Sequence, residues 1–192
     1  MGNVVTIRSR PDDRAKSARV GMMVFLATWA MMFAGLLFAF VFVRIDAEAW
    51  PPPDAPALPR TVPAISSLAL LASCGLIELG RRAIKRNGSK VLAASWYGAA
   101  GLVGVFVVLQ GVLFVTCRSA GLKGAFGGLF LMYVLFQGVG AIAGIPGVLV
   151  VANRARAGRY GALQHVGPSL WATYWYVVAV AWLLIYAGVY WV

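Results

Sequence analysis

Residues 20–43 read VGMMVFLATWAMMFAGLLFAFVFV, a stretch without a single charged side chain. A helix rises about 1.5 Å per residue, so this stretch is long enough to cross the roughly 30 Å hydrocarbon core of a bilayer. The composition of the whole chain agrees, because 61% of its residues are hydrophobic and its mean hydropathy is +0.80. Soluble domains are about half apolar. The sequence therefore predicts an integral membrane protein.

Four further apolar runs of similar length follow the first and cover residues 61–79, 91–115, 126–152 and 170–192. We therefore predict an all-α protein with five transmembrane helices. Residues 1–19 would form a basic arm, and residues 20–192 the five-helix membrane domain. The arm contains acidic residues and no small-residue cleavage site follows a short apolar core, so we expect the first span to be retained rather than removed as a signal peptide.

The lysines and arginines predict the orientation of these spans. Thirteen of the 17 lie in the arm and in the second and fourth connections, and only four lie in the first and third. Because positive loops stay on the cytoplasmic side, the arm is expected to be cytoplasmic and the C-terminus to lie on the outer side. The net charge of +11 then reflects topology and attraction to anionic headgroups. Its scattered distribution argues against a nucleic-acid partner.

The chain offers few side chains for redox or proton chemistry of its own. His165 is its one histidine and is predicted to be an ordinary loop residue, too little for a haem or copper site. Cys74 and Cys117 are interpreted as ordinary apolar or boundary residues. Glu78, near the inner end of the second span, is interpreted as an interfacial carboxylate paired with an arginine at helical spacing, such as Arg81. No catalytic constellation is predicted.

Several residues inside the spans are typical of helix packing. Gly140 and Gly144 form a G-x-x-x-G motif, which lets membrane helices approach closely, and Pro146 is expected to kink the same span. The mid-span tryptophans Trp29 and Trp182 are interpreted as filler between helices. The aromatic residues near the two ends of the last span are interpreted as interfacial anchors: Trp171, Tyr174, Trp175, Tyr190 and Trp191.

The connector between the first two spans, Arg44 to Arg60, reads RIDAEAWPPPDAPALPR. Its consecutive prolines Pro51, Pro52 and Pro53 favour the extended polyproline II conformation. We therefore expect a stiff brace on the outer side, with Trp50 as an anchor to lipid headgroups or to a neighbouring protein.

Three stretches together resemble subunit III of the haem–copper oxidases. The first is G-M-x-x-F-L-x-T-W-x-x-x-F from Gly21 to Phe33, and the second is the W-P-P-P connector that begins at Trp50. The third is Y-W-Y-V-V-A-V-A-W from Tyr174 to Trp182. The resemblance covers about residues 19–192 and is similar to the five-helix short form of that family.

The resemblance implies a non-catalytic subunit of a respiratory oxidase in the bacterial cytoplasmic membrane, with cytochrome c or quinol as the electron donor of the complex. It would pack against catalytic subunit I and other subunits and bind phospholipid, while haem and copper would lie in the partner subunits. The residues expected to make packing, partner or lipid contacts are Trp29, Arg44, Trp50, Pro51, Pro52, Pro53, Gly140, Gly144, Tyr174, Trp175, Tyr176 and Trp182. Two alternatives stay open: an accessory membrane subunit of a nitric oxide reductase or other respiratory complex, and a small transporter.

The buried polar residues of that family are replaced in this chain. Trp29 stands where the resemblance places a membrane-embedded glutamate, and Tyr176 and Ala179 stand where it places a histidine and an aspartate. Two further histidine positions fall at Val139 and Ile142. The role of that glutamate in proton supply or lipid handling is therefore not expected here, and the sequence favours a scaffold.

Overall fold

The structure is a computed structural model, described here for residues 11–49, 56, 58–162 and 166–190. These residues form five helices and no strand, and all five helices are long and apolar enough to cross a membrane, as predicted. In chain order they are α1 (Pro11–Ile45), α2 (Thr61–Ile84), α3 (Ser89–Ser119), α4 (Gly124–Arg156) and α5 (Val166–Tyr190).

The helices extend beyond the apolar runs that predicted them, chiefly at ends rich in charged residues. α1 begins at Pro11, so much of the predicted arm is helical, and α2 and α4 end among arginines at Ile84 and Arg156. Proline fits the first turn of a helix because its missing N–H would have no partner there. Hydropathy detects the part of a helix inside the hydrocarbon core and misses the polar turns beyond it. α4 continues as one helix through Pro146.

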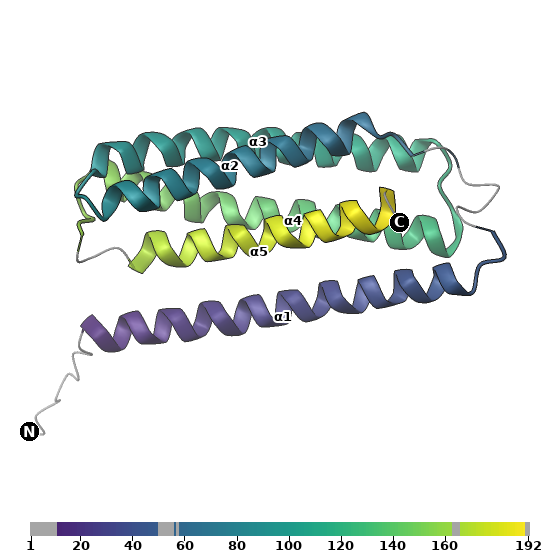
Figure 1. Ribbon diagram of the computed structural model, residues 1–192, viewed down its shortest axis with the longest axis horizontal. Coiled ribbons are helices and arrows are strands. Elements are labelled where there is room, and N and C mark those ends of the chain that lie inside the picture. Colours follow the sequence, from purple (N-terminus) through teal and green to yellow (C-terminus); the bar gives the residue numbers. More distant parts are fainter. Residues whose placement is uncertain (1–10, 50–55, 57, 163–165, 191–192) are drawn as a thin grey trace, which may run out of the picture.

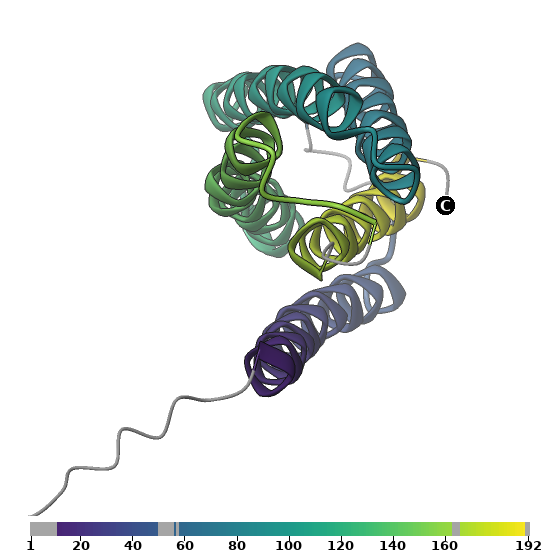
Figure 2. The same ribbon diagram turned by 90° about the vertical axis from the view of Figure 1, so that its left-hand side faces the viewer.

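Helices α2 to α5 lie side by side, and α1 stands apart from them on one flank (Figure 1). Seen along the bundle, α2, α3, α4 and α5 surround a common core, while α1 lies beyond α5 (Figure 2). Among the described residues α1 packs only against α4 and α5.

A tight turn joins α2 to α3. Asn87 has a φ of 58°, and the N–H groups of Asn87 and Gly88 donate to the carbonyls of Ile84 and Ala83. This is the Schellman pattern of helix termination. A Cβ on Gly88 would lie 3.0 Å from the Ala83 oxygen. The Asn87 Oδ1 also accepts a hydrogen bond from the Ala162 N–H at 2.9 Å, which ties this turn to the connection between α4 and α5.

The largest fully buried side chains of the core, between α2, α3, α4 and α5, are aromatic and include Trp96 and Trp175. α1 contributes Leu26, Phe33 and Phe40, which are buried at seven-residue intervals. This spacing places them on one helix face toward the bundle. The rest of α1 is largely exposed, as a lipid-facing helix in a membrane would be.

Candidate functional site

A row of glycines on α4 accommodates aromatic rings from α1 and α5. A Cβ on Gly140 would lie 2.6 Å from Cζ2 of Trp29, and one on Gly144 would lie 2.8 Å from Tyr174 and 2.9 Å from Trp175. All three distances are too short for real contacts, so these positions require glycine. The G-x-x-x-G motif therefore brings predicted contact residues together within this chain. It accommodates side chains, whereas the sequence suggested close contact between helix backbones.

Tyr174 and Trp175 lie inside the bundle, with 2% and 0% of their surface exposed. The Tyr174 hydroxyl donates to the Gly140 carbonyl at 2.6 Å, and the Trp175 indole N–H donates to Ser73 Oγ at 2.7 Å. Their prediction as interfacial anchors is therefore wrong. Sequence gives the distance of these residues from the end of α5, but the side of the helix that faces the core depends on tertiary packing.

Trp182 makes the second bond of this kind between α5 and α2. Its indole N–H donates to Ser67 Oγ at 2.9 Å, and Ser67 in turn donates to the Pro63 carbonyl at 2.8 Å. Phe106 of α3 meets the Trp182 ring edge-on, with a centroid distance of 5.5 Å. Trp182 therefore fills space between α2, α3 and α5.

Trp29 of α1 contacts both α4 and its own helix. One edge of its indole lies against Gly140 of α4 and fills space between the two helices. Its other neighbours include Phe25 and Phe33, whose ring centroids lie 6.0 and 5.8 Å away. The indole N–H has no hydrogen-bond partner among the residues that the structure describes.

An apolar groove of about 370 Å³ runs between α1 and α5. Its walls are mostly aliphatic and aromatic, and only three of the lining side chains bear a hydroxyl: Tyr133, Thr173 and Tyr176. From α1 the groove is lined by Trp29, Ala30, Phe33, Ala34 and Leu37, and from α5 by Val177, Val180, Ala181, Leu184 and Ile185.

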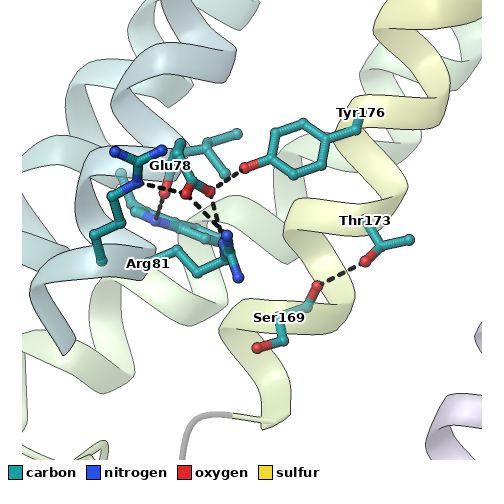
Figure 3. Close-up of polar contacts among 8 residues, drawn as sticks. Glu78, Arg81, Ser169, Thr173 and Tyr176 are labelled. Atoms are coloured by element: carbon teal, nitrogen blue, oxygen red, sulfur yellow. Dashed lines mark hydrogen bonds and ion pairs between the residues drawn. The ribbon is translucent and has the colours of Figure 1, made fainter. Parts of the chain in front are cut away.

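A polar cluster joins α2 to α5 beside one end of this groove (Figure 3). The Glu78 carboxylate accepts two hydrogen bonds from Arg81, at 2.6 and 2.8 Å, and one from Arg82 at 2.7 Å. The Tyr176 hydroxyl reaches across from α5 and donates to the same carboxylate at 2.6 Å. The predicted pairing of Glu78 with an arginine is confirmed. The contact with Tyr176 was not predicted, because helical spacing says nothing about a residue on another helix.

The remaining predicted residues are less informative. Arg44 is half-buried in the last turn of α1. Within the described parts of the chain, no group of three or more histidine, cysteine or acidic side chains could hold a metal ion, and Cys74 and Cys117 are free thiols. Several predictions concern residues that lie outside the described ranges: Trp50, Pro51, Pro52, Pro53, His165 and Trp191.

Comparison with known proteins agrees with this arrangement. The family model for cytochrome c oxidase subunit III matches residues 12–192. The chain belongs to the cytochrome c oxidase subunit III family. The resemblance that the sequence motifs indicated is therefore confirmed, and family membership supports a non-catalytic place in an oxidase complex.

Relatives in the subunit III family share moderate identity over almost the whole chain. Cytochrome c oxidase subunit 3 of Thermostichus vulcanus is 30% identical over 94% of this chain and 88% of its own length. The subunit 3 proteins of Halichoerus grypus and Latimeria chalumnae are each 27% identical over 92% of this chain and 70% of their own length. As a member of this family with five apolar helices, the chain is a multi-pass membrane protein.

Proposed function

We propose that this chain is a structural subunit of a respiratory haem–copper oxidase, which stabilises the catalytic subunit and holds phospholipid. The observation that carries the proposal is the subunit III family match over residues 12–192. The chain would pack against catalytic subunit I in the bacterial cytoplasmic membrane, with its N-terminus on the cytoplasmic side. Haem and copper would lie in the partner subunits, and cytochrome c or quinol would supply the electrons.

The use of polar groups inside the spans supports a scaffold role. Intramembrane polar residues that move ions or protons face a pathway or a water-filled cavity. Here the indole N–H groups of Trp175 and Trp182 bond serines of α2, and the Tyr174 hydroxyl bonds a carbonyl of α4. These bonds hold neighbouring helices together. Trp29, at the position of the family's glutamate, likewise packs on Gly140.

The groove between α1 and α5 supports the lipid-binding part of the proposal. Its volume of about 370 Å³ and its apolar walls suit part of an acyl chain. Both walls consist of membrane-spanning segments, so the lipid would lie along the bundle. Because lipid tails in the bilayer are as apolar as this groove, van der Waals packing against its aromatic and aliphatic side chains would hold the acyl chain, and the hydrophobic effect would contribute little.

Affinity purification of the tagged chain from its native membrane tests the proposal. We expect a larger membrane subunit to co-purify, with haem absorbance and oxygen consumption. A chain recovered alone, without haem absorbance, contradicts the oxidase assignment. Co-purification with a chain that reduces nitric oxide instead of oxygen assigns it to the alternative respiratory complex. A deletion strain should retain haem in the catalytic subunit but lose activity faster during turnover.

A further inference from the structure

A basic hollow lies at the turn between α2 and α3, away from the α1–α5 groove. Its volume is about 650 Å³, and three of its seven lining residues are the cations Arg82, Lys85 and Arg86. The other lining residues are Leu79, Ala83, Gly88 and Val91. Among the residues that the structure describes, no acidic side chain lines it. In Figure 1 this turn lies at the same end of the bundle as the beginning of α1.

The positive charge of the hollow is only partly balanced. Arg82 forms an ion pair with Glu78 at 2.7 Å, but Glu78 also forms one with Arg81. Among the described ion pairs none involves Lys85 or Arg86. One carboxylate therefore serves two arginines, and the two cations at the rim remain available to an anion.

The backbone contributes partial charges of both signs at the hollow, because α2 ends and α3 begins there. α3 begins at Ser89, with Gly88 as its N-terminal cap, no capping side-chain hydrogen bond and no acidic residue in its first turn. Gly88 and Val91 line the hollow, so the start of α3 lies beside the three cations, although the Ser89 and Leu92 N–H groups already donate to the Asn87 and Gly88 carbonyls. Helix N-termini favour anions, but the carbonyl end of α2 opposes this effect at the same place, so the three cations supply the attraction. The bond between Asn87 and Ala162 holds the turn in place before any ligand arrives.

The apolar residues at the hollow distinguish a lipid from a soluble anion. Leu79 is 52% exposed and Val91 is 47% exposed, and both line the hollow beside the cations. Each belongs to a membrane-spanning helix. A free phosphate would leave these two side chains uncovered, whereas a phospholipid would place its phosphate on the cations and the start of its acyl chains on the leucine and valine.

We propose that the hollow at the α2–α3 turn binds the phosphate of an anionic phospholipid. Basic pockets at the membrane surface recognise such headgroups by charge. The inference extends the lipid-binding part of the proposed function and rests on it only in that the chain works in a bilayer. The α1–α5 groove contacts acyl chains whatever their headgroup, so the two lipid sites are separable by headgroup charge.

The test compares two triple variants of the full chain, each purified with its co-purifying subunits into nanodiscs. The site variant is Arg82→Gln, Lys85→Gln, Arg86→Gln. The matched control is Arg154→Gln, Arg156→Gln, Arg159→Gln, which removes the same charge from exposed residues around the end of α4. Lipids retained after partial delipidation are quantified by native mass spectrometry, with phosphatidylglycerol and phosphatidylcholine supplied in equal amounts.

We expect the wild-type chain and the control to prefer phosphatidylglycerol, and the site variant to lose this preference by about tenfold or more, since each cation near the surface attracts anionic lipid. The charge-preserving variant Arg82→Lys, Arg86→Lys should keep this preference, which separates loss of charge from misfolding.

Equal loss of the preference in the site variant and the control overturns the inference, because the attraction would then be diffuse. If millimolar inorganic phosphate displaces the lipid, the hollow is a site for a soluble anion and the proposal of a phospholipid ligand is wrong. If the anionic-lipid site is refuted while phosphatidylcholine is still retained and haem still co-purifies, the proposed oxidase function is unaffected.

Discussion

Gly140 illustrates how a missing side chain determines where two helices meet. Its bare Cα accepts the Trp29 ring of α1, and its carbonyl accepts the Tyr174 hydroxyl of α5. Three helices therefore meet at one residue of α4. The sequence identified Trp29 and Gly140 as packing residues, and it placed Tyr174 at the membrane interface. It could not pair them, because the pairing depends on how the helices are rotated about their axes.

Replacing Gly140 with alanine should force the Trp29 ring away, since the added Cβ would lie 2.6 Å from Cζ2. We expect a loss of about 1–3 kcal/mol of stability, the usual range for overpacking. Thermal unfolding in detergent measures it. Gly104→Ala is the matched control, because its added Cβ meets nothing within 4 Å. Equal melting temperatures for the two variants would refute the contact.

Trp29→Ala should leave a cavity beside Gly140 and destabilise the chain by about 3 kcal/mol, the lower end for a large aromatic. Trp29→Gln should also be disruptive, because the side chain lines an apolar groove where an amide lacks partners. Oxidase yield and turnover in membranes from the variant strains provide the measurement. If both stay at the wild-type level, Trp29 contacts only lipid and its packing role is wrong.

At the scale of elements, α5 is fastened to α2 by two tryptophan–serine hydrogen bonds and one tyrosine–glutamate bond. The tryptophans Trp175 and Trp182 are seven residues apart on α5, so both face the same side of the helix. Hydrogen bonds between membrane helices contribute about 0.6–2 kcal/mol each. The three bonds together fix the register of α5 along α2.

A double-mutant cycle with Trp182→Phe and Ser67→Ala should measure one of these bonds. We expect a coupling of about 0.5–1.5 kcal/mol from chemical unfolding in detergent. The mismatched pair, Trp175→Phe with Ser67→Ala, should show coupling near zero, because Trp175 bonds Ser73 instead. Similar coupling in both cycles would indicate a general change in packing rather than a specific bond.

Glu78→Gln should destabilise the protein more than Tyr176→Phe does. The carboxylate accepts bonds from Arg81, Arg82 and Tyr176, whereas the phenol makes one of them. We expect a loss of about 1–2 kcal/mol for Glu78→Gln and less for Tyr176→Phe, measured by thermal unfolding at low salt. The difference should shrink in high salt, which screens exposed charges such as Arg82. A larger loss of stability for Tyr176→Phe than for Glu78→Gln would contradict the central place of Glu78 in the cluster.

The number and type of the helices could be predicted from the sequence because lipid imposes long apolar runs. Helix ends were less predictable, since Pro11 and Arg156 lie in polar turns. The contacts between residues of different helices were the least predictable. Trp175 and Ser73 are separated by 102 positions in sequence, and Trp182 and Ser67 by 115. No local pattern encodes such a pair.

On the scale of the whole molecule, α1 is the least integrated helix. Only 17% of the most apolar 18-residue segment of α1 is buried, against 44% of the corresponding segments of α4 and α5. Regions with few buried contacts open first. In hydrogen-exchange mass spectrometry of the purified complex in nanodiscs, we expect the ends of α1 to exchange before those of α4. α1 protected as strongly as α4 would indicate that a neighbouring subunit covers it.

The isolated position of α1 has a consequence for biosynthesis. α1 is synthesised before α2 to α5, yet its described partners are α4 and α5, so about a hundred residues must be synthesised between the end of α1 and the end of α4. At roughly 5–20 residues per second, α1 waits on the order of ten seconds before its native neighbour is complete. During this interval α1 has neither of its described helix neighbours, α4 or α5, to pack against. A mean hydropathy of 2.2 lets α1 remain inserted alone until α4 and α5 reach the membrane.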